Sequence, residues 1–164
     1  MGLSLPGKRV LNAAGFAACA GLIAYALYSE HVLYYEPCPL CVLQRVAVIA
    51  LGLLFLAAAL HGPRRRGGIA YAALVALTGL GGLVAAGRHV WLQHLPADRV
   101  PACGPGLDYM LDNFPLQQVV DMVFTGSGEC ATIDWQFLGL SMPAWVFIAI
   151  AALTAGGVWN NLRR

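Results

Sequence analysis

Charged residues are scarce in this chain of 164 residues. They make up 11% of it, against about a quarter of a typical soluble domain, while apolar residues reach 59%. A soluble domain of this length cannot bury that much apolar surface, because small domains leave much of their surface in contact with water. The shortage of charge therefore excludes an ordinary soluble fold and indicates a protein that lies largely in lipid.

The uncharged stretches also lack the alternation of apolar and polar residues that a membrane barrel strand needs. A helix that crosses a bilayer takes about 20 residues, and we expect spans at about residues 10–29, 44–62, 68–90 and 143–161. The first span could be a signal peptide, but its length and the three spans after it favour an uncleaved anchor. With no internal repeat and no second domain, residues 1–164 are expected to form one all-α membrane domain, a bundle of four transmembrane helices.

Acidic residues are absent from one side of the expected bundle. Seven of the ten Lys and Arg residues flank the spans on that side, and all eight acidic residues lie in segments on the other side. Basic flanks stay in the cytoplasm, so both termini and the short loop at residues 61–68 are expected there. The outer side then holds two loops, at about residues 30–41 and 92–142. No basic stripe or nucleic-acid-binding motif occurs, so no nucleic-acid partner is expected.

The second outer loop has room for structure outside the bilayer. Four prolines in its first half exclude a long helix there. Apolar residues then recur on one face of residues 116–124 (Leu116, Val119, Val120 and Val123). They predict a short helix that either lies in the membrane interface or docks a partner. Residues 126–128 (GSG) are expected to form a flexible linker before Cys130.

Only one cysteine, Cys19, lies within a span, where a thiol is usually a small buried apolar group. The outer loops hold Cys38, Cys41, Cys103 and Cys130, and a compartment that permits disulfides makes two pairs the natural interpretation. Linking Cys103 to Cys130 would close 28 residues, worth roughly 3–4 kcal/mol in the chain-entropy model. Linking Cys38 to Cys41 closes only four residues, worth about 2 kcal/mol before strain. That pair is therefore expected to serve chemistry rather than stability.

The Cys38-Pro39-Leu40-Cys41 motif stands at the start of the second span. A helix N-terminus favours a thiolate, because its dipole and free N–H groups stabilise negative charge. Arg45 follows Cys41 by one helical turn, on the same face, and its positive charge would stabilise a thiolate further. Alternatively, Arg45 marks the membrane boundary and extends its charged end to water.

A metal site is the competing interpretation of this motif. It would combine Cys38 and Cys41 with one of three histidines (His31, His89 or His94). Zinc sites, however, usually place ligands at tight spacing in both halves, and Cys103 and Cys130 are not spaced in that way. No metal is therefore expected.

Two segments resemble the disulfide bond formation protein B family, DsbB. They are residues 36–41 (EPCPLC), with Gln44 and Arg45 behind them, and residues 128–131 (GECA), followed by residues 135–143 (WQFLGLSMP). The four spans and both cysteine pairs occur in the family's order over nearly the whole chain. The resemblance implies a bacterial inner-membrane thiol:quinone oxidoreductase that reoxidises a DsbA-like periplasmic thiol oxidase. The quinone is expected to be ubiquinone, with menaquinone as the alternative.

The resemblance also assigns roles to the outer cysteines. The partner's thiolate would attack the Cys103–Cys130 disulfide at Cys103. Cys130 would then attack Cys38 and release Cys41 as a thiolate facing the quinone.

The remaining assignments concern the quinone site, where the resemblance places Arg45, His89 and Met142 beside Cys41. From the residues alone, His89 could be an interfacial histidine and Met142 apolar filler. Gln44 stands where some relatives carry glutamate, which is expected to leave Arg45 less neutralised.

Two other functions compete. Vitamin K epoxide reductase-like proteins, in which electrons flow the other way, place the Cys-x-x-Cys motif late in the chain, whereas here it comes early. A transport or metal-binding subunit with structural disulfides would carry ionisable residues within its spans, and here they cluster at the ends.

Overall fold

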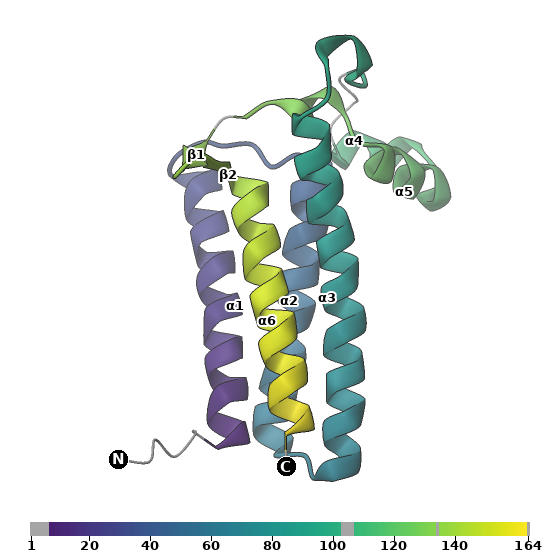
Figure 1. Ribbon diagram of the computed structural model, residues 1–164. Coiled ribbons are helices and arrows are strands. Elements are labelled where there is room, and N and C mark those ends of the chain that lie inside the picture. The colour runs from purple at the N-terminus through teal and green to yellow at the C-terminus, as the bar shows by residue number, and fades with distance from the viewer. Residues whose placement is uncertain (1–6, 103–106, 134, 164) are drawn as a thin grey trace.

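The computed structural model describes residues 7–102, 107–133 and 135–163, which form a bundle of four long helices with smaller elements at one end (Figure 1). The long helices are α1 (Lys8–His31), α2 (Pro39–His61), α3 (Arg65–Gln93) and α6 (Met142–Leu162). Each is long and apolar enough to cross a membrane. The prediction of an all-α membrane protein with four spans is therefore confirmed. Each helix begins before the expected span, because helical hydrogen bonding continues into polar residues that hydropathy leaves out.

Helix α2 lies between α1 and α3, and α6 packs along α3. The ring of Phe55, in α2, fills the centre of the bundle, and a Cβ on Gly15 or Gly157 would lie within 3.0 Å or 2.6 Å of it. Small residues at such contacts are what let helices in lipid approach closely. Cys19 is buried in the same core, as expected of an apolar thiol, and the core comprises Cys19, Val48, Leu51, Phe55, Val75 and Ile150.

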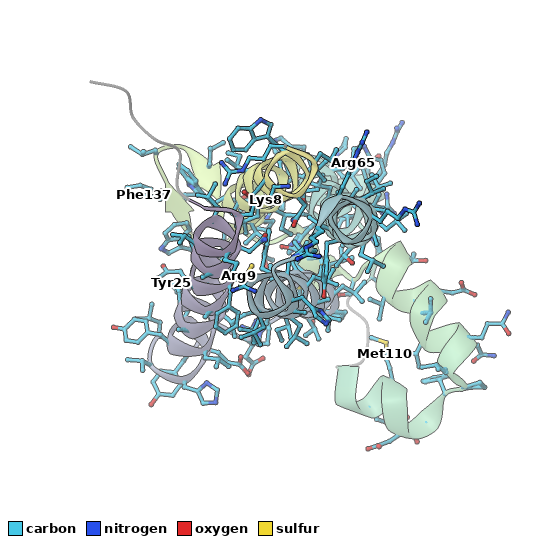
Figure 2. All side chains as sticks on the ribbon, turned by 90° about the horizontal axis from the view of Figure 1, so that it is seen from below. Lys8, Arg9, Tyr25, Arg65, Met110 and Phe137 are labelled. Carbon is cyan, nitrogen blue, oxygen red and sulfur yellow. The ribbon has the colours of Figure 1, made fainter. Side chains whose placement is uncertain are left out.

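Both chain ends lie at the same end of the bundle (Figure 1). Figure 2 looks at that end and shows Lys8, Arg9 and Arg65 grouped there. Beneath them, Asn12 and Asn161 exchange two amide hydrogen bonds, at 3.3 and 3.2 Å, and so tie α1 to α6. The outer cysteine motif and the second loop lie at the opposite end, so the bundle separates basic residues from cysteines.

Short elements make up the cysteine end of the molecule. The second loop contains η1 (Ala97–Arg99), α4 (Leu107–Asn113), α5 (Leu116–Thr125) and η2 (Gly128–Ala131). A hairpin of β1 (Gln136–Phe137) and β2 (Leu140–Ser141) then leads into α6. Its two turn residues, Leu138 and Gly139, both have positive φ, as a tight two-residue hairpin turn requires. The sequence analysis did not anticipate this hairpin.

Helix α5 is the short helix expected after residue 115, and it lies with α4 beside the bundle (Figure 1). Some of its apolar residues face α4 and are buried, and others are exposed. Val119 and Val123 are buried with Met110 of α4, whereas Leu116 and Val120 are 71% and 45% exposed. The expected location of α5, in the membrane interface or against a partner, stays a prediction.

Candidate functional site

The Cys-Pro-Leu-Cys motif forms the first turn of α2. Cys38 is the N-cap and Pro39 is the first helical residue, a position that suits proline because its fixed φ is helical and its missing N–H would be unpaired there. The Sγ atoms of Cys38 and Cys41 lie 3.2 Å apart. Both sulfurs are therefore at the positive end of the helix dipole, the environment expected to favour a thiolate.

His89 of α3 lies against both sulfurs. It is buried, with Nε2 3.7 Å from Cys38 Sγ and Nδ1 3.9 Å from Cys41 Sγ. Gln44, also buried, places its amide nitrogen 3.0 Å from His89 Nδ1. An amide nitrogen can only donate, so Nδ1 accepts and the neutral ring carries its proton on Nε2, the nitrogen nearest Cys38. Gln44 thus sets the tautomer that His89 presents to the sulfurs.

Gln44 is a site residue whose role the sequence analysis missed. It entered that analysis only as a departure from the family pattern. The available signal was its spacing, because three residues after Cys41 put it on the same face of α2. Its partner His89 is on another helix, and no local pattern connects the two.

Cys38, Cys41 and His89 also form a group that could hold a metal ion. Their ligand atoms lie within 4.8 Å of one another, and no further His, Cys or carboxylate joins them in residues 7–102, 107–133 and 135–163. Structural zinc sites are almost always closed by four ligands. The group is better described as two thiols beside one imidazole than as a structural metal site.

Arg45 crosses from α2 to α1. Its guanidinium forms an ion pair with Glu30 and donates to the carbonyl of Ala26, 3.2 Å away. Glu30 therefore supplies a negative charge to Arg45 from the neighbouring helix, and the expectation that Gln44 leaves Arg45 less neutralised than glutamate would stays a prediction. Arg45 and Glu30 are only partly exposed. Arg45 is therefore held in place at the cysteine end of the bundle and does not extend into water.

A pocket, here named the outer pocket, opens beside Cys41 at the cysteine end of the bundle. All four residues expected at a cofactor site line it, namely Cys41, Arg45, His89 and Met142. Met142 is the first residue of α6. Most of the wall is apolar and comes from α1, α2 and α6: Leu22, Ile23, Ala26, Val48, Pro143 and Val146. Mostly apolar walls with a few convergent polar groups are typical of small-molecule sites.

Cys130 lies on the other side of Cys38. It is fully buried within η2 and packs with Cys38, Leu40 and Leu92. Its hydrogen bond with Cys38, together with burial, raises the pKa of the Cys130 thiol. The four cysteines of the described part of the chain are free thiols. Cys103, the expected partner of Cys130, lies outside the described residues.

The segment before Cys130 is packed against α3. Gly126, Ser127 and Gly128 are all buried, so the expectation of a flexible linker is wrong. Gly126 has φ 82° and ψ 154°, a region that is essentially restricted to glycine. A Cβ there would lie 2.4 Å from Leu92 Cδ1. Glycine is therefore required for this close approach, and the approach holds Cys130 against Cys38.

Gly126→Ala is expected to release Cys130 from its buried position. Backbone strain of this kind costs about 1–3 kcal/mol, so the undocked population should rise roughly ten-fold or more. Alkylation of Cys130 by a small maleimide, followed by mass spectrometry of its peptide, measures this. Gly139→Ala is the matched control, because Gly139 also has positive φ but has open space around its Cβ position. Equal alkylation rates in the two variants would contradict the docking role of Gly126.

Comparison with known proteins places this site in a family. A family model described as "Disulfide bond formation protein DsbB" matches residues 8–160. The chain is similar to disulfide bond formation protein B of Hahella chejuensis, at 54% identity over 91% of this chain and 90% of the relative. It is also 50% identical to the protein of that name from Methylococcus capsulatus, over 99% of this chain and all of the relative. A third relative of that name, from Nitrosococcus oceani, is 54% identical over 89% of this chain and 86% of its own length.

The match therefore covers the first turn of α2, His89, Arg45, Met142 and the Cys130 segment together. Cysteine thiols gathered at one end of a membrane bundle agree with the chemistry in the family's name. The chain belongs to the DsbB family of disulfide bond formation proteins and is a disulfide-forming membrane oxidoreductase.

Proposed function

We propose that this protein reoxidises a DsbA-like periplasmic thiol oxidase and passes the electrons through two cysteine pairs to a membrane quinone. The observation that carries the proposal is the position of Cys38. It touches buried Cys130 on one side and Cys41 on the other, and Cys41 lines the outer pocket. Electrons that arrive at Cys130 therefore have a continuous path of sulfur atoms to a pocket with apolar walls.

The first exchange step takes place at Cys103 and rests on the family resemblance. A thiolate of the reduced partner attacks Cys103 in the Cys103–Cys130 disulfide. A partner–Cys103 disulfide forms, the Cys103–Cys130 bond breaks, and Cys130 is released. The second thiol of the partner then displaces Cys103, which leaves the partner oxidised and the second loop with the two electrons.

The second step joins the two loops. Cys130 attacks Cys38 in the Cys38–Cys41 disulfide, so that the Cys130–Cys38 bond forms and Cys41 leaves as a thiolate. Contact between Cys130 and Cys38 supports this step, and the start of α2 stabilises the departing Cys41. Burial of Cys130, which raises its pKa, makes it a poor leaving group. The reverse attack by Cys41 on Cys38, which must expel Cys130, is disfavoured for that reason.

The outer pocket fits a quinone ring. Its walls are apolar, and Arg45 and His89 bring N–H donors of the kind that a carbonyl oxygen accepts. A bound quinone would supply a two-electron acceptor and leave as the quinol. In the tautomer that Gln44 selects, His89 can relay a proton: Nδ1, 3.9 Å from Cys41 Sγ, takes a thiol proton when the Gln44 amide gives way, and Nε2 passes its own proton on. We expect ubiquinone in this pocket.

Before the oxidation by quinone, Cys103 attacks Cys130, which re-forms the Cys103–Cys130 disulfide, breaks the Cys130–Cys38 bond and releases Cys38. The thiols of Cys38 and Cys41 and a quinone then become a disulfide and a quinol, with electrons and protons balanced.

The same proposal sets the orientation in the membrane. We place the protein in the bacterial inner membrane with both termini in the cytoplasm. Support comes from the grouping of Lys8, Arg9 and Arg65 at the end that holds the termini (Figure 2), because basic flanks remain cytoplasmic. The cysteine end then faces the periplasm, where the partner oxidase is found.

The test is a stopped-flow assay of the purified protein with a reduced DsbA-like protein and a soluble quinone. Quinone absorbance should fall as the oxidised partner accumulates, with one quinone reduced for each partner molecule oxidised. Serine substitution of each outer cysteine in turn (Cys38, Cys41, Cys103 and Cys130) should stop this coupled turnover. A folded protein that oxidises no partner in the presence of quinone would overturn the proposal.

Arg45→Ala is expected to raise the KM for quinone roughly ten-fold. It removes a charged donor, worth about 1.5–3 kcal/mol, and leaves the Glu30 carboxylate unpaired at the edge of the outer pocket. Steady-state kinetics with saturating partner measure the change. The double variant Glu30→Gln/Arg45→Ala separates the two causes. It should reverse only the part of the KM increase that comes from the unpaired carboxylate, and the part that comes from the lost donor should remain. Arg99→Ala, at an exposed arginine of η1, is the matched control, and an equal KM in all three variants would contradict the assignment.

A further inference from the structure

The hydroxyl of Ser127 lies against the sulfur of Cys130. Ser127 is buried, and its Oγ is 3.8 Å from Cys130 Sγ. The backbone brings the two side chains together, because the N–H of Cys130 donates to the carbonyl of Ser127 and closes a tight turn. Within the described part of the chain, this hydroxyl has no other hydrogen-bond partner. The only group that Ser127 can serve there is a sulfur that takes part in the proposed exchange.

Helix capping is the usual role of a serine at this position, and Ser127 does not fill it. Ser127 is the N-cap of η2. A serine at the N-cap of a helix normally accepts a hydrogen bond from one of the next backbone N–H groups. The side chain of Ser127 makes no such bond, because its hydroxyl is paired with the side chain three residues further on. Capping therefore does not explain why a hydroxyl stands at this position.

The chemical state of Cys130 sets the direction of this hydrogen bond. In the Cys103–Cys130 disulfide the sulfur carries no proton, so Ser127 must donate and the sulfur must accept. The same holds for the thiolate that Cys130 becomes when the disulfide opens. The donor is therefore in place before the charge develops, and its hydrogen bond strengthens as the sulfur becomes negative. An interaction of this kind stabilises the transition state more than the ground state.

Two backbone N–H groups point to the same sulfur. Those of Leu40 and Ser127 also donate to Cys130. Leu40 is the second residue of α2, and the first N–H groups of a helix have no partner within it. The hydrogen bond with Cys38 and burial raise the pKa of the Cys130 thiol, and the two N–H groups oppose this rise without cancelling it. A thiol with a raised pKa leaves a disulfide slowly, so a further donor at Cys130 should speed the exchange.

We propose that Ser127 is a catalytic residue whose hydroxyl stabilises the Cys130 thiolate in both exchange steps. This inference rests on the proposed function, because it assumes those steps. In the first, the partner's thiolate bonds to Cys103, and Cys130 leaves with the electron pair of the broken bond. In the second, that pair forms the Cys130–Cys38 bond, and Cys41 leaves with the pair of the Cys38–Cys41 bond. The proton of Ser127 stays on its oxygen throughout.

Ser127→Ala is expected to slow the formation of the Cys38–Cys130 disulfide about ten-fold, because it removes a hydrogen bond to a charged sulfur. The oxidised protein, free of quinone, is mixed with a reduced DsbA-like protein and quenched with acid at intervals. Mass spectrometry of the linked peptides then measures the disulfide. Ser127→Thr keeps the hydroxyl and should recover most of the rate. Ser141→Ala is the matched control and should exchange at the native rate, because Ser141 is also buried at this end of the molecule but donates to Gln93 Oε1.

The rate at which Cys130 is alkylated in the fully reduced protein separates this role from packing. The thiolate is the reactive form, so Ser127→Ala should lower that rate. A loss of packing would release Cys130 and raise the rate, as is expected of Gly126→Ala. Faster alkylation of Ser127→Ala, its exchange at the native rate, or an equal loss in Ser141→Ala would overturn the role of Ser127. A native protein that forms no Cys38–Cys130 disulfide would instead contradict the proposed function.

Discussion

Cys41→Ser is expected to lower the rate of quinone reduction by at least about 10³-fold, because a serine hydroxyl can neither form a disulfide with Cys38 nor leave one as a thiolate. Among the described cysteines, Cys38 and Cys41 both line the outer pocket, with their sulfurs in contact. Cys41 is the more exposed of the two, and Cys38 is the one that packs against Cys130 and takes the bond with it, so Cys41 is the thiol left to meet the quinone. The measurement is the stopped-flow decay of quinone absorbance with reduced partner in excess.

The variant should keep its first exchange step. Attack at Cys103 does not involve Cys41, so a disulfide-linked complex with the partner should still form and be visible on a non-reducing gel. Cys19→Ser is the matched control, because it makes the same replacement at a thiol buried in the bundle core, and it should turn over a tail-less quinone at the native rate. Turnover by Cys41→Ser at more than a tenth of the native rate would remove Cys41 from the electron path.

The helices could be predicted because their signals are local. A stretch without charge is itself the reason a segment enters lipid, and four such stretches produced four helices. The start of α2 is local too, since Pro39 at the first helical position places both sulfurs of the motif in one turn. The hairpin at residues 136–141 was missed because only Gly139 signals its turn. Leu138, which also has positive φ, is a residue type that rarely adopts it.

Contacts between helices were beyond sequence analysis. Glu30 reaches Arg45 across α1 and α2, and Gln44 reaches His89 across α2 and α3. Each pair depends on how far one helix is rotated and shifted against the next. Packing around residues such as Phe55 decides that rotation and shift. The same holds for Gly126. Its neighbours suggested flexibility, and the contact with Leu92 that requires a glycine comes from another element.

His89→Leu is expected to lower kcat about 10²-fold with little change in the KM for partner, since a positioned acid–base group typically contributes 10²- to 10⁴-fold. The reaction must move two protons from thiols to the quinol, and His89 is a buried imidazole within 4.0 Å of both sulfurs. Leucine keeps most of the volume and removes the proton carrier. His94→Leu, at an exposed histidine just beyond α3, is the control and should be neutral.

Gln44 provides a sharper test, because it acts only through the tautomer of His89. As a glutamine it donates to Nδ1 and keeps the proton on Nε2. Gln44→Glu presents an acceptor instead, which draws a proton to Nδ1 and leaves Nε2 either unprotonated or part of an imidazolium ion. Nitrogen NMR of labelled histidine should show the proton move from Nε2 to Nδ1 in the neutral ring, or appear on both nitrogens, and the pH profile of kcat should shift with it. Gln44→Leu, which removes the partner without reversing its role, should lower kcat by only a few-fold and leave a mixture of tautomers. Normal turnover by His89→Leu would show that His89 only packs against the sulfurs. An unchanged nitrogen spectrum in Gln44→Glu would contradict the role of Gln44 in setting the tautomer.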